Sequence, residues 1–345
     1  MRKSFELLRE LLNIPSPSGF EEEAASKWLE YVGKFTATQK DVYGNSIAEL
    51  LPAQSNNDLK KIMLVGHIDE VGMMVNYISD DGFIYISKIG GVEPIILPAQ
   101  MVNIHNKNGV VKGVVGRRPP HLADEDEDDE IKFHNIFVDI GAKDKEDAVK
   151  QVSVGDPITF DAPCCELINE KIVGRGVDDK VGAFVVARVL EELSHKEIFI
   201  PIVGVASIQE ENGAYGAMMV AKSVKPSAVI VVDVTHATDV PDISKERHGD
   251  CKLGEGPVLS IGSASHKGIT ASLEEIATKN RIPIQKQISP RWTGTDADVI
   301  FTKNGGIPTA LVSIPNRYMH SPVEMIDLND VENAIKLITK WYESK

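Results

Sequence analysis

The sequence predicts an α/β fold, in which a mainly parallel sheet has helices on both faces and a small β-barrel-like domain is inserted. Two observations support this prediction. Strand and helix patterns alternate after residue 165, and short β-rich pieces separated by turns fill residues 71–160. A chain of 345 residues, 42% of them apolar, is long enough to bury the cores of two domains. We therefore expect one domain built from residues 1–70 and 161–345, and an inserted β-rich domain over 71–160.

The first 70 residues predict two helices followed by strands. Apolar residues recur at helical spacing between Phe5 and Leu12, and the prolines that begin at Pro15 end that helix. A second helix is expected over Phe20 to Val32, because its first turn holds three glutamates that the helix dipole favours. Two strands then lead to the apolar strand Lys61 to Val65, which ends at Gly66-His67.

The rest of the chain divides into the β-rich segment and an alternating segment. In the first, Asn108-Gly109 between two strand-like runs predicts a β-hairpin. In the second, alternation favours a parallel sheet with crossover helices. The expected elements are a helix over Asp178–Leu193, a strand over Phe199–Ser207, a helix over Gly213–Val220, a strand over Ala228–Val232, a helix over Ile269–Asn280, a strand over Thr309–Ile314 and a helix over Asn329–Tyr342.

Composition excludes several classes of function. The formal net charge of −14 disfavours nucleic-acid binding, which needs a basic surface. The seven consecutive acids from Asp124 to Glu130 predict a solvated loop. No apolar run is long enough to span a membrane, and the charged N-terminus lacks a signal-peptide block. Three cysteines without a CxxC pair fit a reducing compartment and buried structural thiols, so we expect a cytoplasmic protein.

Metal-capable side chains cluster where strands are expected to end. In an open α/β sheet, the functional crevice lies beyond the carboxyl ends of the strands, so separate strands can deliver their terminal residues to one place. Alone, each motif is commonplace: HxD is usually polar surface, DD before a helix is usually an N-cap, and EE after a strand is usually a solvated turn. Their joint occurrence predicts a metal site. The candidates are His67, Asp69, Asp178, Asp179, Glu210, Glu211, Asp233 and His320.

Two histidines with several carboxylates suit zinc, cobalt or manganese. Two histidines, one bridging acid and two terminal acids can hold a pair of ions about 3.5–4 Å apart. Spare carboxylates then remain. Asp69, two residues after His67, is placed to hydrogen-bond a ring nitrogen and orient that histidine. Glu210, beside a ligand Glu211, is placed to serve as a general base.

Five motifs in this order resemble the M42 metallo-aminopeptidases, the group that includes glutamyl and deblocking aminopeptidases and the TET particles. They read GHIDEVGMMV, GRGVDDKVG, QEENGAYGA, VVDVTHATDVP and NRYMHSPVE, with RRPPHL and VDIGA between the first two. The related M20 and M28 families have a short gap between the first histidine and the DD pair. Here 111 residues separate them, and the β-like stretch lies inside that gap, which favours M42. Asn212 after the EE pair and the dense acidic run are less typical of the family.

The resemblance implies a role for each candidate. His67 and His320 resemble the terminal histidine ligands, and Asp178 resembles the bridging carboxylate. Glu211 and Asp233 resemble the remaining acids, one for each metal ion. Glu210 resembles the general base of the family, and Asp69 resembles the residue behind the first histidine. The family also implies that the inserted β domain mediates dimerisation, and that many members form dodecamers.

These features predict a dinuclear metal-dependent aminopeptidase that cleaves the N-terminal peptide bond of peptides with a free N-terminus. The expected partners are peptide substrates and further copies of the chain, as dimers that assemble into a dodecamer, and neither nucleic acid nor a membrane. One alternative is an endoglucanase-type glycoside hydrolase, whose two carboxylates would leave the histidines without a role. A second is a non-catalytic scaffold particle of the same fold. No candidate ligand lies in the inserted segment, so that segment need not help to build the site.

Overall fold

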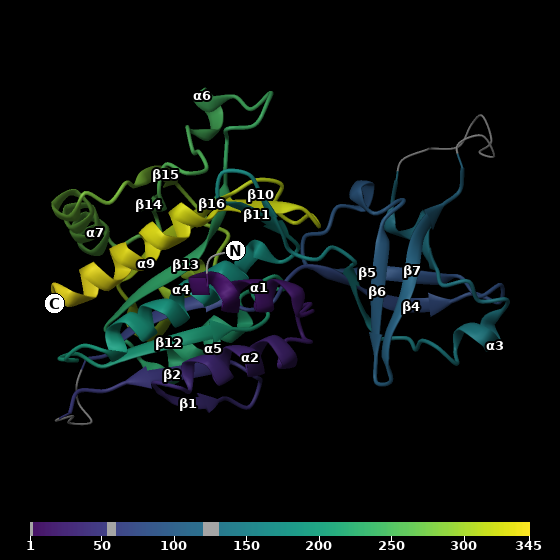
Figure 1. Cartoon of the computed structure of the whole chain (residues 1–345), viewed down its shortest axis with the longest axis horizontal. Coiled ribbons are helices and arrows are strands. Elements are labelled where there is room, and N and C mark those ends of the chain that lie inside the picture. Colours follow the sequence, from purple (N-terminus) through teal and green to yellow (C-terminus); the bar gives the residue numbers. More distant parts are fainter. Residues whose placement is uncertain (1–2, 54–59, 120–130) are drawn as a thin grey trace.

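The computed structural model describes residues 3–53, 60–119 and 131–345. A large α/β part holds an eight-stranded sheet, and a closed six-stranded barrel projects from one end of it (Figure 1). The predicted fold class is therefore confirmed. In the part of the chain that the structure describes, no helix combines the length and the apolar character that a membrane crossing would require. The acidic run from Asp124 to Glu130 lies outside the described residues.

The sheet has four parallel strands at its centre, so the carboxyl ends of these strands meet at one edge. An antiparallel hairpin extends one side of the sheet, and a pair that runs parallel within itself but antiparallel to its neighbour extends the other. In spatial order the strands are β1 (Ala37–Lys40), β2 (Ser46–Leu50), β12 (Ile202–Ser207), β3 (Ile62–His67), β13 (Ala228–His236), β16 (Thr309–Asn316), β14 (Val258–Gly262) and β15 (Gln285–Ser289).

Helices cover both faces of this sheet because the side chains of each central strand alternate between two cores. In β3, Ile62 and Leu64 belong to the larger core, whereas Met63 and Val65 belong to the smaller one. The larger core is completed by α1 (Glu6–Asn13), α2 (Glu22–Val32), α4 (Val177–Ser194), α7 (Lys267–Asn280) and α9 (Leu328–Glu343). The smaller core is completed by α5 (Tyr215–Val224) and α8 (Ala297–Ile300).

The barrel forms within the segment that the sequence marks as β-rich, and every neighbouring pair of its strands is antiparallel. Its buried apolar residues form a core separate from the two sheet cores. The predicted hairpin is present, but its turn is at Lys107-Asn108, one residue earlier than expected. Around the barrel the strands are β4 (Gly72–Ile78), β5 (Ile84–Ile89), β8 (Ile136–Asp139), β7 (Gly109–Arg117), β6 (Met101–Asn106) and β9 (Pro157–Phe160).

Small elements connect these parts. A three-stranded antiparallel sheet of β10 (Cys165–Leu167), β11 (Lys171–Gly174) and β17 (Glu324–Asp327) lies next to the start of α4. In the described ranges the other short helices are α3 (Lys145–Ala148), α6 (Lys245–His248) and 3₁₀ turns at Lys3–Phe5, Pro94–Ile96, Phe133–Asn135 and Lys303–Gly305.

Three sequence expectations need correction. The strand expected from Phe199 begins only at Ile202, because Pro201 precedes it and lacks the N–H that a central strand needs. The helix expected from Asp178 includes Val177, yet Asp178 has extended backbone angles inside it. Of the three cysteines, all free, Cys251 is buried as expected, but Cys165 is exposed, so it is not a buried structural thiol.

Candidate metal centre

The six residues predicted to bind metal or move protons line one cavity of about 550 Å³ at the carboxyl edge of the central strands. His67 is the last residue of β3, and Asp233 lies on the neighbouring strand β13. The other four are supplied by the connections around that edge. Asp178 lies at the start of α4, Glu210 and Glu211 follow β12, and His320 follows β16. The expectation that separate strand ends deliver these side chains to one place is therefore met by their positions.

Asp178 lies between the two histidines. Its Oδ1 is 3.1 Å from His67 Nε2, and its Oδ2 is 3.4 Å from His320 Nε2. His320 Nε2 is also 3.5 Å from Glu211 Oε2. Ligand atoms of His67, Asp178 and Asp233 form one compact group, and those of Asp178, Glu211 and His320 form another, each within 4.8 Å. Asp178 is thus common to both groups, with one oxygen toward each histidine.

The electrostatics of the cavity fit bound cations. Burial, together with the charge of Asp178, raises the pKa of Glu211 and of Asp233 well above the usual range. On its own, burial would raise the pKa of Asp178 as well. Hydrogen bonds from His320 and His67 outweigh the effect of burial and keep the pKa of Asp178 below its usual value. Within the described residues, Glu211 Oε1 is buried without a hydrogen-bond partner. A buried carboxylate oxygen left without a partner beside His320 is typical of a residue that binds a metal ion.

Asp69 lies behind His67, as the sequence predicts, and it is fully buried. His67 Nδ1 is 3.4 Å from Asp69 Oδ1 and 3.2 Å from the carbonyl oxygen of the same residue. Asp69 also accepts hydrogen bonds from the backbone amides of Glu210 and Glu211, at 3.0 and 3.1 Å. It therefore contacts both the first histidine and the loop that carries the two glutamates.

Two further buried carboxylates near the cavity hold backbone amides of the centre: Asp179, which the sequence places among the candidates without a specific role, and Glu324, which it does not. Asp179 accepts a hydrogen bond from the backbone amide of His67 at 3.1 Å. Glu324 accepts one from the amide of Asp178 at 3.0 Å and one from the amide of His320 at 2.7 Å. The available signals were the second residue of the DD pair and the glutamate that closes the HSPVE motif. Neither signal indicates which amide the carboxylate would contact.

The inserted segment supplies part of the wall of the centre. Gly90 and Gly91 follow β5 and lie against the candidate ligands. A Cβ built on Gly90 would be 3.1 Å from Glu211 Cβ, and one built on Gly91 would be 2.5 Å from His320 Nδ1. In the described residues of this segment no side chain belongs to either candidate ligand group, but the segment does help to build the site.

Comparison with known proteins decides the family. The sequence model described as M42 glutamyl aminopeptidase matches residues 44–337. This chain belongs to the M42 family. Membership of this family confirms the resemblance predicted from the sequence and makes the chain a peptidase of the hydrolase class. It therefore argues against both alternatives, the glycoside hydrolase and the non-catalytic scaffold. M42 peptidases depend on metal ions, and the two candidate groups around Asp178 fit that dependence.

Individual M42 relatives cover nearly the whole chain. A lysyl aminopeptidase from Pyrococcus furiosus is 35% identical over 96% of this chain and 95% of its own length. The structure of an aminopeptidase from the archaeon Desulfurococcus kamchatkensis is 34% identical, with a TM-score of 0.92 over 99% of this chain and 95% of that one. The TET1 peptidase of Pyrococcus horikoshii, which can assemble into a tetrahedron or a large octahedral shell, is 29% identical with a TM-score of 0.86 over 98% of both chains.

Proposed function

We propose that this chain is a dinuclear metal-dependent aminopeptidase that hydrolyses the N-terminal peptide bond of peptides, with Glu210 as the general base. The observation that carries the proposal is the position of Asp178, which belongs to both candidate ligand groups and directs one oxygen toward each histidine. A carboxylate in that position can bridge two ions, whereas a single-ion site would leave one of the histidines unused.

The ligand assignment follows from the two groups. His67 and Asp233 would hold one ion, Glu211 and His320 would hold the other, and Asp178 would bridge them. Imidazole and carboxylate donors suit zinc or cobalt, with manganese also compatible. Two such ions, when bound, would lower the pKa of a coordinated water and polarise the carbonyl of the scissile bond.

Glu210 is a carboxylate of the cavity that lies close to His67. It belongs to neither ligand group, and its Oε2 is 3.9 Å from His67 Nε2. Burial raises its pKa to about 10, and bound cations would lower that pKa toward the range in which the carboxylate is ionised and can accept a proton. In the proposed reaction Glu210 accepts the proton of the attacking water and passes it to the leaving amine.

The charge of the cavity supports cleavage from the N-terminus. Among the described residues, its lining includes several acids and no lysine or arginine. Five described acids line the cavity, so even with two divalent ions bound it would keep a net negative charge, which favours a positively charged α-amino group over an internal peptide segment. Peptides with a free N-terminus are the proposed substrates, and the same peptides with an acetylated N-terminus should not be cleaved.

The test is Glu210→Gln, which keeps the shape of the side chain and removes the base. We expect kcat to fall by about 10²–10⁴-fold, the size of a lost general base, while elemental analysis still finds about two ions per chain. Glu30→Gln, an exposed glutamate on α2, is the matched control and should behave as the unmodified chain does. A Glu210→Gln enzyme with near-normal kcat would overturn the assignment of the base.

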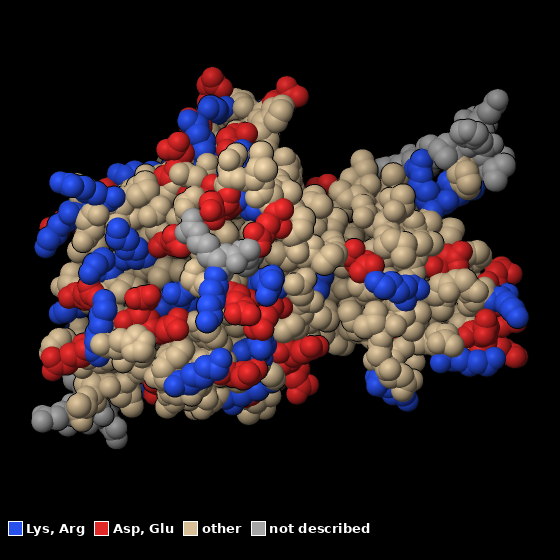
Figure 2. All heavy atoms as spheres, in the orientation of Figure 1, with Lys and Arg blue, Asp and Glu red and all other residues tan. Residues whose placement is uncertain are grey.

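We also propose that the chain is a cytoplasmic protein that forms dimers through the barrel, and dodecamers from those dimers. The three cysteines are free, which fits a reducing compartment. Apolar side chains are exposed on the barrel: Tyr77, Met101, Val110 and Val114 are each between 44% and 56% exposed. Met101 and Val114 are cross-strand partners, so they present one continuous apolar surface. On the face shown in Figure 2, charged side chains are sparser over the barrel strands than over the α/β part.

Sedimentation tests the interface. Replacing Met101 and Val114 together by lysine should yield smaller species, because a specific interface of more than about 1,000 Å² does not tolerate two unpaired charges. Ile168→Lys is the control, since Ile168 is 82% exposed and lies in the turn between β10 and β11. Deleting Asp124 to Glu130 should leave both metal content and assembly intact. If the double variant stays fully assembled, the interface lies elsewhere.

A further inference from the structure

The loop that carries Glu210 and Glu211 is held by carboxylates from distant parts of the chain. Three consecutive backbone amides donate hydrogen bonds to them. The amide of Gln209 donates to Glu21 Oε1 at 3.1 Å, and the amides of Glu210 and Glu211 donate to the two carboxylate oxygens of Asp69. Gln209 has a φ of +54°, in the left-handed region that residues other than glycine rarely adopt. These contacts therefore add to the local backbone hydrogen bonds of the turn, such as that from the Gly213 amide to the Glu210 carbonyl, in holding a conformation that glutamine rarely adopts.

Glu21 reaches this loop from the start of α2. It occupies the N-cap position of the helix, but its side chain caps none of the amides of that helix. It accepts hydrogen bonds from Gly19 at 2.7 Å and from Gln209 instead. Glu21 is only 6% exposed, whereas the adjacent Glu22 and Glu23 are exposed to solvent. One of three consecutive glutamates is thus turned inward to the loop.

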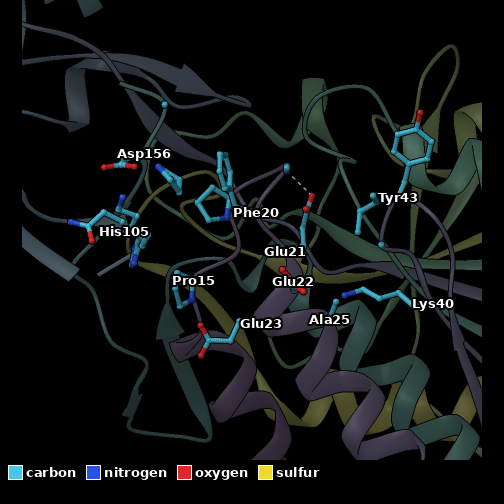
Figure 3. A pocket seen from close by; sticks show the side chains of 18 of the residues that line it. Pro15, Phe20, Glu21, Glu22, Glu23, Ala25, Lys40, Tyr43, His105 and Asp156 are labelled. Atoms are coloured by element: carbon cyan, nitrogen blue, oxygen red, sulfur yellow. Dashed lines mark hydrogen bonds between the residues drawn. The ribbon is translucent and has the colours of Figure 1, made fainter. Parts of the chain in front are cut away.

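A second cavity lies on the other side of Glu21. It has a volume of about 930 Å³, and α2, the turn around Tyr43 and the barrel loop after His105 line it (Figure 3). Glu21 and Ile208, the residue before Gln209, are both part of its wall. Glu21 therefore lies against open space on one side and contacts the loop on the other, so shortening its side chain leaves room for water rather than a closed void.

The burial of Glu21 is costly. A buried carboxylate without a cationic partner is unfavourable, and the hydrogen bonds that Glu21 accepts come from neutral backbone amides. Burial, followed by the charge of Asp69, raises the pKa of Glu21 to about 7. What Glu21 gives in return is the placing of the two amides that it accepts from, and one of these belongs to the loop of the metal centre.

We propose that Glu21 is a positioning residue of the metal centre, which fixes the Gln209–Glu211 loop so that the carboxylates of Glu210 and Glu211 keep their places. It acts through the Gln209 amide and touches neither the substrate nor the ions. The inference rests on the proposed roles of Glu210 and Glu211. The role requires a side chain long enough to place an acceptor oxygen at the Gln209 amide, and it does not require the negative charge.

Three variants separate reach from charge. Glu21→Gln keeps the reach and an acceptor oxygen but removes the charge, Glu21→Asp keeps the charge but is shorter by one methylene, and Glu21→Ala removes both. The same three changes at the exposed Glu22 serve as matched controls. The measurements are hydrogen–deuterium exchange of the peptide containing Gln209–Glu211 in the metal-free protein, zinc and manganese affinity by calorimetry, and kcat and KM on an aminoacyl amide.

We expect the order unmodified chain ≈ Glu21→Gln > Glu21→Asp > Glu21→Ala. In the alanine variant the loop peptide should exchange faster, and metal affinity and kcat should each fall by about 10–100-fold, the usual range for residues behind a metal ligand. KM should change less than kcat, because the substrate contacts remain. The Glu22 variants should match the unmodified chain in all measurements.

An aspartate variant as active and as protected as the unmodified chain would overturn the proposal, and so would a glutamine variant as impaired as the alanine variant. Both changes are small, so the comparison holds even if Glu21→Ala does not fold. The exchange and calorimetric measurements do not need activity. If the unmodified chain cleaves no aminoacyl amide but the order still appears in exchange and affinity, the proposed function fails while this inference stands. If the chain is active and the order is absent, only this inference fails.

Discussion

Gly91→Ala tests how closely the inserted segment packs on the metal centre. The added Cβ would lie 2.5 Å from His320 Nδ1 and 2.7 Å from Cε1, while ordinary contacts need about 3.5 Å. The φ of Gly91 is outside the left-handed region, so alanine brings no backbone strain of its own. The ring of His320, whose side chain is 34% exposed, can withdraw, and it must move by about 1 Å.

A movement of that size exceeds the tolerance of about 0.2 Å expected for a metal–ligand distance. We therefore expect Gly91→Ala to weaken binding of the ion held by Glu211 and His320, and to lower kcat by about 10²-fold. Metal analysis after dialysis, together with kcat, measures both effects.

The control is Gly268→Ala, at the start of α7. There the Cβ would also meet a histidine ring, His266, at 3.2 Å, but this ring is exposed and outside the lining of the metal cavity. Full metal content and a kcat within twofold of the unmodified chain for Gly91→Ala would refute the reasoning. Such a result would mean that the backbone around Gly91 moves aside to accept the Cβ and does not fix the position of the His320 ring.

Two further predictions concern buried carboxylates. Asp178→Ala should lose both ions on dialysis, whereas Asp233→Ala should lose mainly one, and full occupancy of either site in the Asp178 variant would exclude a bridge. Glu70→Gln should lower the free energy of unfolding by about 3–5 kcal/mol in denaturant titrations. Arg175 and Lys180 form buried ion pairs with the Glu70 carboxylate, and the substitution would leave their charges buried without a counter-charge. These cations outweigh burial and lower the pKa of Glu70 from 4.5 to about 2, so its stabilisation is present above about pH 4.5 and lost as the pH falls toward 2. Glu70→Gln should flatten the pH dependence in that window, and an unchanged slope would argue against the ion pairs.

The sequence predicts the central strands, and the gathering of the candidate ligands at one edge of the sheet, because these signals are local. A buried parallel strand is a continuous apolar run, and a polar residue that ends such a run must lie at the carboxyl edge of the sheet, as His67 does. The edge pair β14 and β15 escaped prediction. The side chains of β15 are all at least partly exposed, and β14 pairs antiparallel with β16, so this pair lacks the buried apolar run and the parallel alternation that mark the central strands.

The residues that support the ligands were not predictable, because their roles depend on contacts between distant segments. Glu21 resembles its two neighbours in sequence, and only the path of the chain brings it to Gln209, 188 residues away. Glu324 and Gly91 likewise meet His320 only after β17 and the barrel are in place. Residue type and spacing can nominate a ligand, whereas a supporting residue is defined by the one amide or ring that it touches.

These contacts make the centre a joint product of three regions of the chain. The α/β part supplies the candidate ligands, the segment before α2 supplies Glu21, and the inserted segment supplies Gly91. A change in how the barrel sits on the α/β part would therefore move the wall against His320. If the barrel also forms the subunit interface, assembly and metal binding share a structural element, and they should weaken together in interface variants. Independent loss of assembly, with full metal content and unchanged kcat, would show instead that the connection after β5 is rigid enough to insulate the centre.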